Sequence, residues 1–157
     1  MNVIFLDFNG VMDTYENMDE VDLENLSILK KLIKLLDAKV VISSSIKNTY
    51  YYSGRHNSVC LYLMDVLSLN GIEVCGITPK LENREDEIIL YLKQHPEINY
   101  YYILEDDYLF PRLFQHQIKL PCQNDKGNGL KEIGFEKIKE RLRKDGVIDE
   151  SNRRCKK

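Results

Sequence analysis

The sequence predicts an α/β fold in which a central, five-stranded parallel sheet carries helices on both faces. Short apolar runs alternate along the chain with longer stretches in which apolar residues recur every three or four positions. Acidic residues, serines, glycine or proline close the runs, which is typical of buried strands that end in turns. Because consecutive parallel strands need a crossover connection, this alternation favours a sheet that is covered on both sides.

The five expected strands are the short apolar runs, at residues 3–6, 39–42, 72–77, 100–104 and 117–120. The first is closed by Asp7, the second by the serines 43–45 and the third by residues 78–79. Three acids at 105–107 follow the fourth, and Pro121 ends the fifth. If the first strand is central, right-handed crossovers place strands two and three on one side of it and strands four and five on the other.

Four helices are expected between and after these strands, at residues 23–36, 59–67, 84–94 and 133–143. The first repeats leucine and isoleucine at helical spacing, which gives it one apolar face. Asn70 and Gly71 are stop signals for the second, and the third ends before Pro96. The last is highly charged and is expected to expose one face, and residues 127–129 before it are expected to form a loop.

The size and composition fit one domain without a membrane segment. The chain has 157 residues, of which 43% are hydrophobic and 30% are charged. We expect residues 1–150 to form a single domain and residues 151–157 to form a basic, flexible tail. No apolar stretch approaches the roughly 20 residues that a spanning helix needs. The formal net charge of -3 provides no overall positive field for nucleic acid, although a local basic patch remains open.

Cysteine usage and the N-terminus indicate the cellular compartment. The four cysteines form no C-x-x-C pair, and the N-terminus lacks the charged-then-apolar pattern of a secretory leader. Reduced thiols and the lack of a leader are typical of an intracellular protein, so we expect a cytoplasmic location.

Acidic and hydroxyl side chains follow three of the expected strands. Asp7, Ser43 and Glu105 each stand at the carboxyl end of a strand, and these ends meet at one edge of a parallel sheet. Several carboxylates in one small volume repel one another unless a cation joins them. Oxygen ligands favour Mg²⁺, which keeps some of its waters and recruits a substrate phosphate. The sequence therefore predicts a site for magnesium and a phosphate group at this edge.

Hydroxyl and basic residues near the same edge are candidate phosphate ligands. Ser43 and Ser44 offer hydroxyls and backbone N–H groups. Lys47, Lys80 and Arg84 supply positive charge, and Arg84 opens a helix whose N-terminus favours anions. Each base also has an interpretation as a solvated surface charge. With Asp7 as the nucleophile, the set suits attack on a phosphoryl group.

The order of these residues resembles the haloacid dehalogenase (HAD-like) superfamily. Residues 7–11, Asp-Phe-Asn-Gly-Val, match its Asp-x-Asp-Gly-Val/Thr motif except at Asn9, and Ser43 matches its second motif. Lys80 or Arg84 matches the basic third motif, and residues 105–106 match the acidic fourth. The chain is most similar to the HAD domain found in Swiss Army Knife RNA repair proteins, from about residue 3 to residue 130. This resemblance implies a Rossmann-like HAD fold with a minimal cap or none.

The resemblance also implies roles for individual residues. Asp7 would accept the phosphoryl group, and Ser43 and one base, Arg84 or Lys80, would hold its charge. The remaining expected assignments are Gly10, Ser44 and Lys47 at the substrate, and Asp7, the Asn9 backbone carbonyl, Glu105 and Asp106 at Mg²⁺. The substrate would be a phosphorylated molecule, with RNA or a nucleotide as the class that the family suggests.

Asn9 departs from the family pattern. The family uses the acid at this position to protonate the leaving group and then to activate water, and an amide does not exchange protons in this way near neutral pH. Losing a general acid or base typically costs about 10²–10⁴-fold in rate. Asp13 is a candidate replacement. The departure leaves two functions open, an enzyme that hydrolyses its phospho-intermediate slowly and a catalytically impaired module that binds phosphate or metal.

Two further interpretations remain open. A receiver-type signalling domain also uses a strand-end aspartate with Mg²⁺, but its acid pair follows the first strand, whereas the pair in this chain follows the fourth. The aromatic residues 50–52, with Arg55 and His56, are consistent with a base-stacking patch or with a loop that covers the site.

Overall fold

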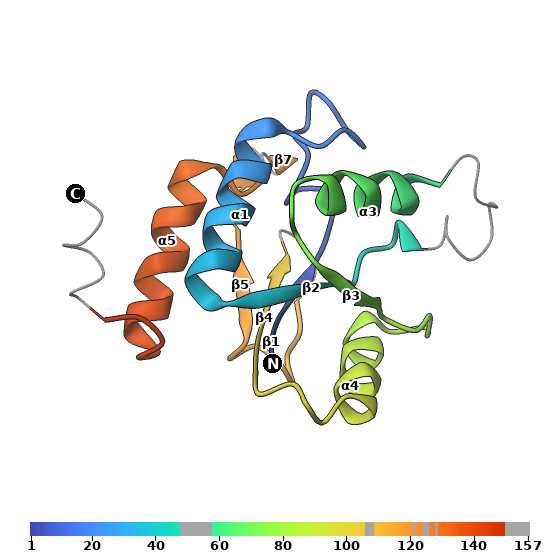
Figure 1. The fold of residues 1–157 in the computed structure, drawn as a ribbon, viewed down its shortest axis with the longest axis vertical. Coiled ribbons are helices and arrows are strands. Elements are labelled where there is room, and N and C mark those ends of the chain that lie inside the picture. Colours follow the sequence, from blue (N-terminus) through green and yellow to red (C-terminus); the bar gives the residue numbers. More distant parts are fainter. Residues whose placement is uncertain (48–57, 106–108, 121, 124–125, 128, 150–157) are drawn as a thin grey trace.

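The computed structural model describes residues 1–47, 58–105, 109–120, 122–123, 126–127 and 129–149. Its centre is a five-stranded parallel sheet formed by β1 (Asn2–Leu6), β2 (Ala38–Ile42), β3 (Val74–Ile77), β4 (Tyr100–Glu105) and β5 (Gln117–Lys119) (Figure 1). The strand order is β3-β2-β1-β4-β5, which confirms the expected central position of the first strand. Receiver-type domains have the order 2-1-3-4-5, so the topology also separates this chain from them.

The described helices are α1 (Leu23–Leu36), α3 (Val59–Leu69), α4 (Arg84–Gln94) and α5 (Lys131–Lys144). Polar side chains cap three of them. The side chains of Asp22 and Ser58 accept from the first turns of α1 and α3. Asn83 accepts from the backbone N–H groups of Glu85 and Asp86 at the start of α4. These caps satisfy N–H groups that the helix itself leaves without a partner, and they fix where each helix begins.

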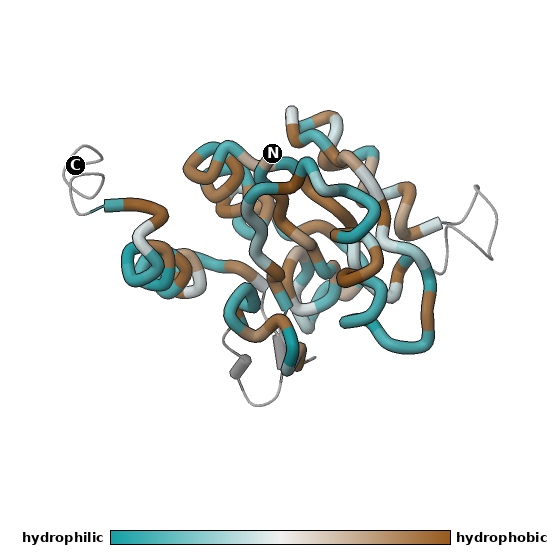
Figure 2. Tube along the Cα trace, turned by 90° about the horizontal axis from the view of Figure 1, so that it is seen from below, coloured by the Kyte–Doolittle hydropathy of each residue, from teal (hydrophilic) through white to brown (hydrophobic). Residues whose placement is uncertain are grey.

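Two hydrophobic clusters cover the two faces of the sheet. On β1, Ile4 and Leu6 belong to the larger cluster, which contains the inward residues of α1, α3 and α5. Val3 and Phe5 belong to the smaller cluster, which includes Ile88 of α4. Figure 2 shows that the central strands are mainly hydrophobic, whereas many of the surrounding connections are hydrophilic. The sheet therefore has helices on both faces, as the sequence predicts.

Two parts of the structure differ clearly from the sequence-based prediction. The third strand begins at Val74 rather than at residue 72, because the N–H of Ile72 bonds to the carbonyl of Leu67 and closes the end of α3. Gly127 does not lie in a loop. It belongs to β7 (Lys126–Gly127), which pairs with β6 (Cys122–Gln123) in an antiparallel hairpin. Strands of two residues are too short to leave a periodic signal in the sequence.

The segment that covers the carboxyl edge of the sheet is short. Residues 12–22 connect the turn after β1 to α1 and contain no helix or strand, so no separate cap domain is inserted there. The second expected covering segment, residues 48–57 with the aromatic run 50–52, lies outside the described residues, as does the expected tail 151–157. Among the described helices, none combines the length and the apolar character that crossing a membrane requires.

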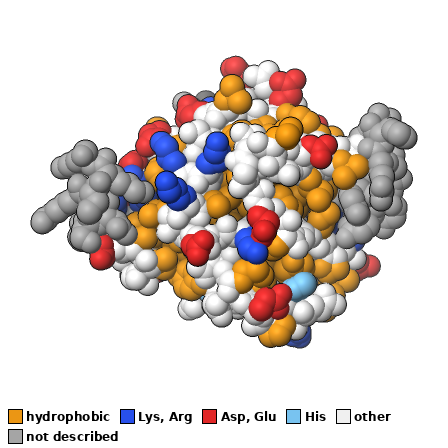
Figure 3. All heavy atoms as spheres, in the orientation of Figure 1, with side chains coloured by type: hydrophobic (Ala, Val, Ile, Leu, Met, Phe, Trp, Pro, Cys, Tyr) orange, Lys and Arg blue, Asp and Glu red, His pale blue; other side chains and the backbone are white. Residues whose placement is uncertain are grey.

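Charged side chains of both signs occur on the surface. On the face seen in Figure 3, acidic groups are scattered, and one small group of lysine or arginine side chains lies over α1 and α5. This mixture agrees with the small net charge of the chain.

Candidate active site

The ends of β1, β2 and β4 bring three predicted site residues to one edge of the sheet. Leu6 pairs with Ile42 on one side and with Leu104 on the other, so the residues that follow them lie at the same level. Backbone bonds extend this register, because Asp7 N–H reaches Leu104 O at 3.4 Å and Ser43 N–H reaches Leu6 O at 3.0 Å. Distant segments of the sequence therefore form one local surface.

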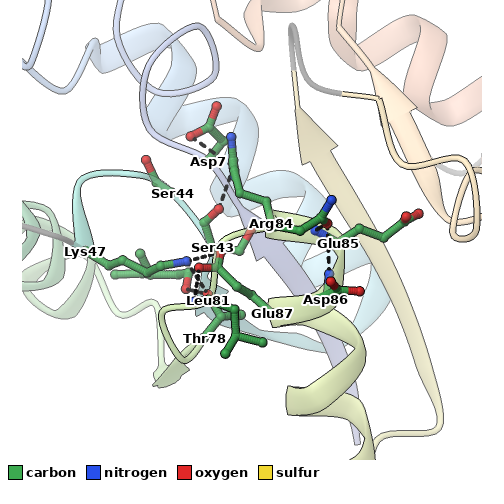
Figure 4. A network of polar contacts seen from close by, with 12 residues as sticks. Asp7, Ser43, Ser44, Lys47, Thr78, Leu81, Arg84, Glu85, Asp86 and Glu87 are labelled. Carbon is green, nitrogen blue, oxygen red and sulfur yellow. Dashed lines mark hydrogen bonds and ion pairs between the residues drawn. The ribbon is translucent and has the colours of Figure 1, made fainter.

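Arg84 joins these three strand ends. It is the first residue of α4, and its Nη2 donates to Ser43 O at 2.5 Å (Figure 4). The same nitrogen donates to Glu105 Oε2 at 2.8 Å. The same nitrogen lies 3.6 Å from Asp7 Oδ1. Asp7 is only 6% exposed and Glu105 only 2%. Buried carboxylates are costly without a partner, and the guanidinium provides one for both.

This geometry distinguishes between the two candidates for the basic motif residue. Arg84 contacts the edge of the sheet, whereas Lys80 is exposed in the connection that precedes α4. Of the two, Arg84 is therefore the residue that the structure places against Asp7. Whether Arg84 serves as the motif base in a reaction stays a prediction.

Lys47 lies in a buried ion pair beneath the same edge. Its Nζ donates to Glu87 Oε1 of α4 and, at 3.0 Å, to Thr78 Oγ1. The side chains of Lys47 and Glu87 are 2% and 4% exposed, so the surface interpretation of Lys47 is wrong. Burial lowers the pKa of the Lys47 ammonium, the Glu87 carboxylate opposes this shift, and the charge of Arg84 adds to it.

The serine turn and Gly10 lie at the expected edge of the sheet, and local hydrogen bonds hold both turns. Ser43 and Ser44 are both buried, and Ser44 Oγ accepts from the N–H of Ile46 at 3.3 Å. Gly10 has a positive φ of 79°, a conformation that glycine adopts at little cost. Its N–H donates to Asp13 Oδ1 at 2.8 Å, which fixes the turn after Asp7.

Asn9 forms a link to residues 12–22, the covering segment. Its Nδ2 donates to Asp13 Oδ2 at 2.7 Å and to Asp19 Oδ1 at 2.9 Å. Asp13 is 2% exposed and also accepts from the N–H groups of Gly10 and Asp19. A proton on either oxygen of Asp13 would face an N–H donor. These bonds support a structural role for Asp13 and give no support to its use as a replacement acid.

Sequence reasoning missed the acids Glu85 and Glu87, and with them Thr78. Glu85 accepts from the backbone N–H groups of Arg112 and Leu113 and from Arg112 Nε, so it anchors the segment before β5 to α4. Glu87 accepts from Lys47 and from Leu81 N–H. A signal for Glu87 was present, because residues 87, 88 and 91 form the inward stripe of the helix and an acid on such a stripe needs a buried partner.

The described oxygen donors fit Mg²⁺ in chemical type. The Asp7 carboxylate and the Asn9 backbone carbonyl are hard ligands of the kind that magnesium prefers. Glu105 is bonded to Arg84, and Asp106 and Asp107 lie outside the described residues. Within the described ranges, no group of three acidic, histidine or cysteine side chains is arranged to hold a metal.

The sheet order and the convergence of Asp7, Ser43 and Arg84 at its carboxyl edge define a Rossmann-like domain of the HAD-like class. The chain belongs to the family described as the HAD domain in Swiss Army Knife RNA repair proteins, whose model matches residues 3–132. HAD domains are typically Mg²⁺-dependent phosphohydrolases. Comparisons with curated proteins and with solved structures gave no match.

Proposed function

We propose that this domain transfers a phosphoryl group from a phosphate monoester to Asp7 in a Mg²⁺-dependent reaction. The contact of Arg84 with the ends of β1, β2 and β4 is the observation that carries the proposal. A cation beside a buried carboxylate offsets the charge of the nucleophile and attracts the phosphate that it attacks. The combination also lies at the carboxyl edge of the sheet, where open α/β folds commonly bind ligands.

In the proposed reaction, an Asp7 oxygen attacks phosphorus and the bond from phosphorus to the leaving oxygen breaks. Arg84 balances the charge on the phosphoryl oxygens, and the turn at Ser43 and Ser44 contacts them through its hydroxyl groups and the Ser44 N–H, because the Ser43 N–H is bonded to Leu6 O. Mg²⁺, held by the Asp7 carboxylate and the Asn9 carbonyl with Glu105 or Asp106, supplies further charge stabilisation when bound. Because Asn9 provides no acid, the leaving oxygen takes its proton from solvent water, and the products are an aspartyl-phosphate and an alcohol.

The second half of the reaction is proposed to be slow. Hydrolysis needs water to lose a proton as it attacks the aspartyl-phosphate, and the bond from Asp7 to phosphorus must break. The amide of Asn9 cannot take that proton, and its Nδ2 is committed to Asp13 and Asp19. Loss of a positioned acid or base typically lowers a rate by about 10²–10⁴-fold. We therefore expect the phosphorylated protein to accumulate.

A phosphate at the end of RNA, or on a nucleotide, is the proposed substrate class. The family occurs in RNA repair proteins, which supports nucleic-acid phosphate as the substrate. The short covering segment is a second support, because residues 12–22 are not large enough to form a cap domain over the site. A large substrate can reach a site of this kind with only its terminal phosphate entering.

Turnover of phosphorylated substrates tests the proposal. We would compare p-nitrophenyl phosphate, a nucleoside monophosphate and RNA oligonucleotides with a 5′- or 3′-terminal phosphate, each with Mg²⁺ and with EDTA. The wild-type protein is expected to release product only with Mg²⁺, and Asp7→Ala is expected to release none. Equal activity in both proteins, or activity that EDTA does not change, would contradict the proposal.

The role of Asn9 favours one second candidate, a module that binds phosphate or metal without turnover. The bonds from Asn9 to Asp13 and Asp19 hold the covering segment, which is a use for an amide that an acid does not share. This candidate predicts that inorganic phosphate and Mg²⁺ bind to the protein while no substrate transfers its phosphoryl group to Asp7. Mass spectrometry after mixing with substrate separates the two candidates.

A further inference from the structure

The buried pair of Lys47 and Glu87 connects two elements that are far apart in the sequence. Lys47 follows the serine turn after β2, and Glu87 lies in the first turn of α4. Both oxygens of Glu87 are used, Oε1 by Lys47 and Oε2 by Leu81 N–H at 2.8 Å. Lys47 Nζ is also bonded to Thr78 Oγ1, which follows β3. The pair is thus a junction of three segments.

The two connected elements are the ones that carry the proposed phosphate ligands. The backbone N–H of Lys47 donates to Ser44 O at 3.1 Å, so the lysine is part of the serine turn. Glu87 is on the same first turn of α4 as Arg84, whose Nη2 donates to Ser43 O. Figure 4 shows both links between the turn and the helix, one through Arg84 and one through Lys47 and Glu87.

Stability alone does not account for a buried ion pair at this place. Taking two charges out of water costs several kcal/mol for each ion, and well-packed apolar side chains of similar volume often give equal or greater stability. What the pair provides is a set of hydrogen bonds that have a preferred direction. Its hydrogen bonds hold the lysine and the glutamate in one geometry, whereas an apolar contact tolerates sliding.

We propose that Lys47 and Glu87 are positioning residues that hold the serine turn and Arg84 at the separation that a phosphate requires. The inference rests on the proposed function for the identity of the ligand. Lys47 has this role behind the site, because its ammonium is buried and is bonded to Glu87 and Thr78. This role replaces the expectation that Lys47 contacts the substrate. Glu87 and Thr78 are added to the residues on which phosphate binding depends.

Three variants and one matched control test this role. Glu87→Gln keeps the shape and one acceptor oxygen but removes the charge. Lys47→Met with Glu87→Leu replaces the pair by apolar side chains, and Lys47→Met alone removes only the cation. The control is Lys39→Met with Glu73→Leu, which removes an exposed ion pair at the opposite end of β2 and β3. Each protein is measured by thermal unfolding, by calorimetric titration with inorganic phosphate in Mg²⁺, and by KM and kcat for p-nitrophenyl phosphate.

The double apolar variant and Glu87→Gln are expected to fold and to bind phosphate about tenfold more weakly, with KM rising more than kcat falls. The control should keep the wild-type values. The inference is overturned if the double apolar variant keeps wild-type phosphate affinity. It is also overturned if Glu87→Gln keeps that affinity while both proteins with Met at position 47 lose it, because this pattern means that Lys47 contacts phosphate directly.

A crystal structure of the Glu87→Gln protein provides a readout that does not depend on turnover or on phosphate. Arg84 Nη2 is expected to lie beyond hydrogen-bond distance of Ser43 O, and an unchanged bond would refute the positioning role. Failure of the proposed function has a different signature, since the wild-type protein would then show no Asp7-dependent turnover whatever the Arg84 geometry is.

Discussion

The two sides of Asp7 differ in what they offer a phosphate ester. On one side, the serine turn and Arg84 supply donors and a cation at positions that the family pattern predicts, and the buried Lys47–Glu87 pair lies behind them. On the other side, Asn9 and the covering segment offer an amide and carboxylates that bond to one another. The side proposed to bind phosphate keeps the residues that the family pattern predicts, whereas the side proposed to move protons departs from that pattern at Asn9.

This difference teaches that binding and proton transfer are separable parts of such a site. Charge balance for a phosphoryl group requires only fixed cations and N–H donors, which do not change during the reaction. Proton transfer requires a group that changes its own charge at the right moment. A domain can therefore keep the groups that balance the charge of a phosphoryl group and lose the group that transfers protons.

The largest effect is expected from removing the nucleophile. If the hydrolytic half is slow, as proposed, the wild-type protein should retain a phosphoryl group after mixing with a phosphodonor and Mg²⁺, and Asp7→Asn should retain none. Intact-mass measurement after an acid quench detects the added group, and peptide mapping locates it. Asp65→Asn, a change at an exposed acid on α3, is the control and should label as the wild type does. A phosphoryl group found at any other residue would refute Asp7 as the acceptor.

Removing the guanidinium at the junction should give the next largest effect. Arg84→Gln leaves the buried Glu105 carboxylate without its cation, which typically costs about 3–5 kcal/mol in the free energy of unfolding. Loss of one donor to transferring oxygens lowers kcat by about 10²–10³-fold. Urea unfolding and the rate of Asp7 phosphorylation measure the two effects.

Arg84→Lys distinguishes charge from geometry at this junction. A lysine keeps the positive charge, but its side chain is one bond shorter than the path to Arg84 Nη2, the nitrogen that bonds to both Ser43 O and Glu105. We expect it to recover part of the stability and little of the rate, and Lys39→Gln at the surface to change neither. Full recovery of the rate by lysine would mean that charge alone is required.

The binding side could be predicted from the sequence because it depends on strand ends. Buried parallel strands are continuous apolar runs, so the residue after each run is recognisable, and right-handed crossovers then bring Asp7, Ser43 and Glu105 to one edge. Arg84 was recognisable because it opens a helix with an inward apolar stripe. No side-chain geometry was needed for these steps.

The partners of buried polar side chains could not be predicted in the same way. Lys47 and Glu87 come from segments forty residues apart, and nothing in their periodicity states that they meet. Asn9 stood out as a departure, but the sequence did not show that its amide bonds to two carboxylates. Such pairings depend on rotamers and packing, which hydrophobic patterns do not encode.

Exchanging the amide and the acid tests the proton-transfer side with an intermediate effect. Asn9→Asp alone places three carboxylates together and removes two amide donors, so we expect the free energy of unfolding to fall by about 2–3 kcal/mol. Asn9→Asp with Asp13→Asn restores one amide–carboxylate bond and leaves an acid at position 9. This double variant should regain only part of the stability, because the new amide nitrogen at position 13 faces the N–H of Gly10 or Asp19. It should release phosphate from Asp7 about 10²-fold faster than the wild type.

Single-turnover decay of the phosphorylated protein and urea unfolding measure the exchange. Asp13→Asn alone is the matched control, because it changes the covering segment without adding an acid at position 9. It should not accelerate the decay. If Asn9→Asp proves as stable as the wild type, the amide does not hold the covering segment, and the comparison drawn between the two sides of Asp7 loses its structural basis.

The smallest effect is expected where the covering segment contacts α3. The N–H of Val21 donates to the Tyr62 hydroxyl at 3.0 Å, and Tyr62 is partly exposed. Tyr62→Phe removes this acceptor and keeps the ring, so it should lower the free energy of unfolding by about 0.5–1.5 kcal/mol and change phosphate affinity by less than twofold. Hydrogen exchange at Val21 should become faster, while exchange at Lys47 should stay unchanged. Loss of phosphate affinity in this variant would show that the covering segment takes part in binding, and the division between the two sides of Asp7 would then be incomplete.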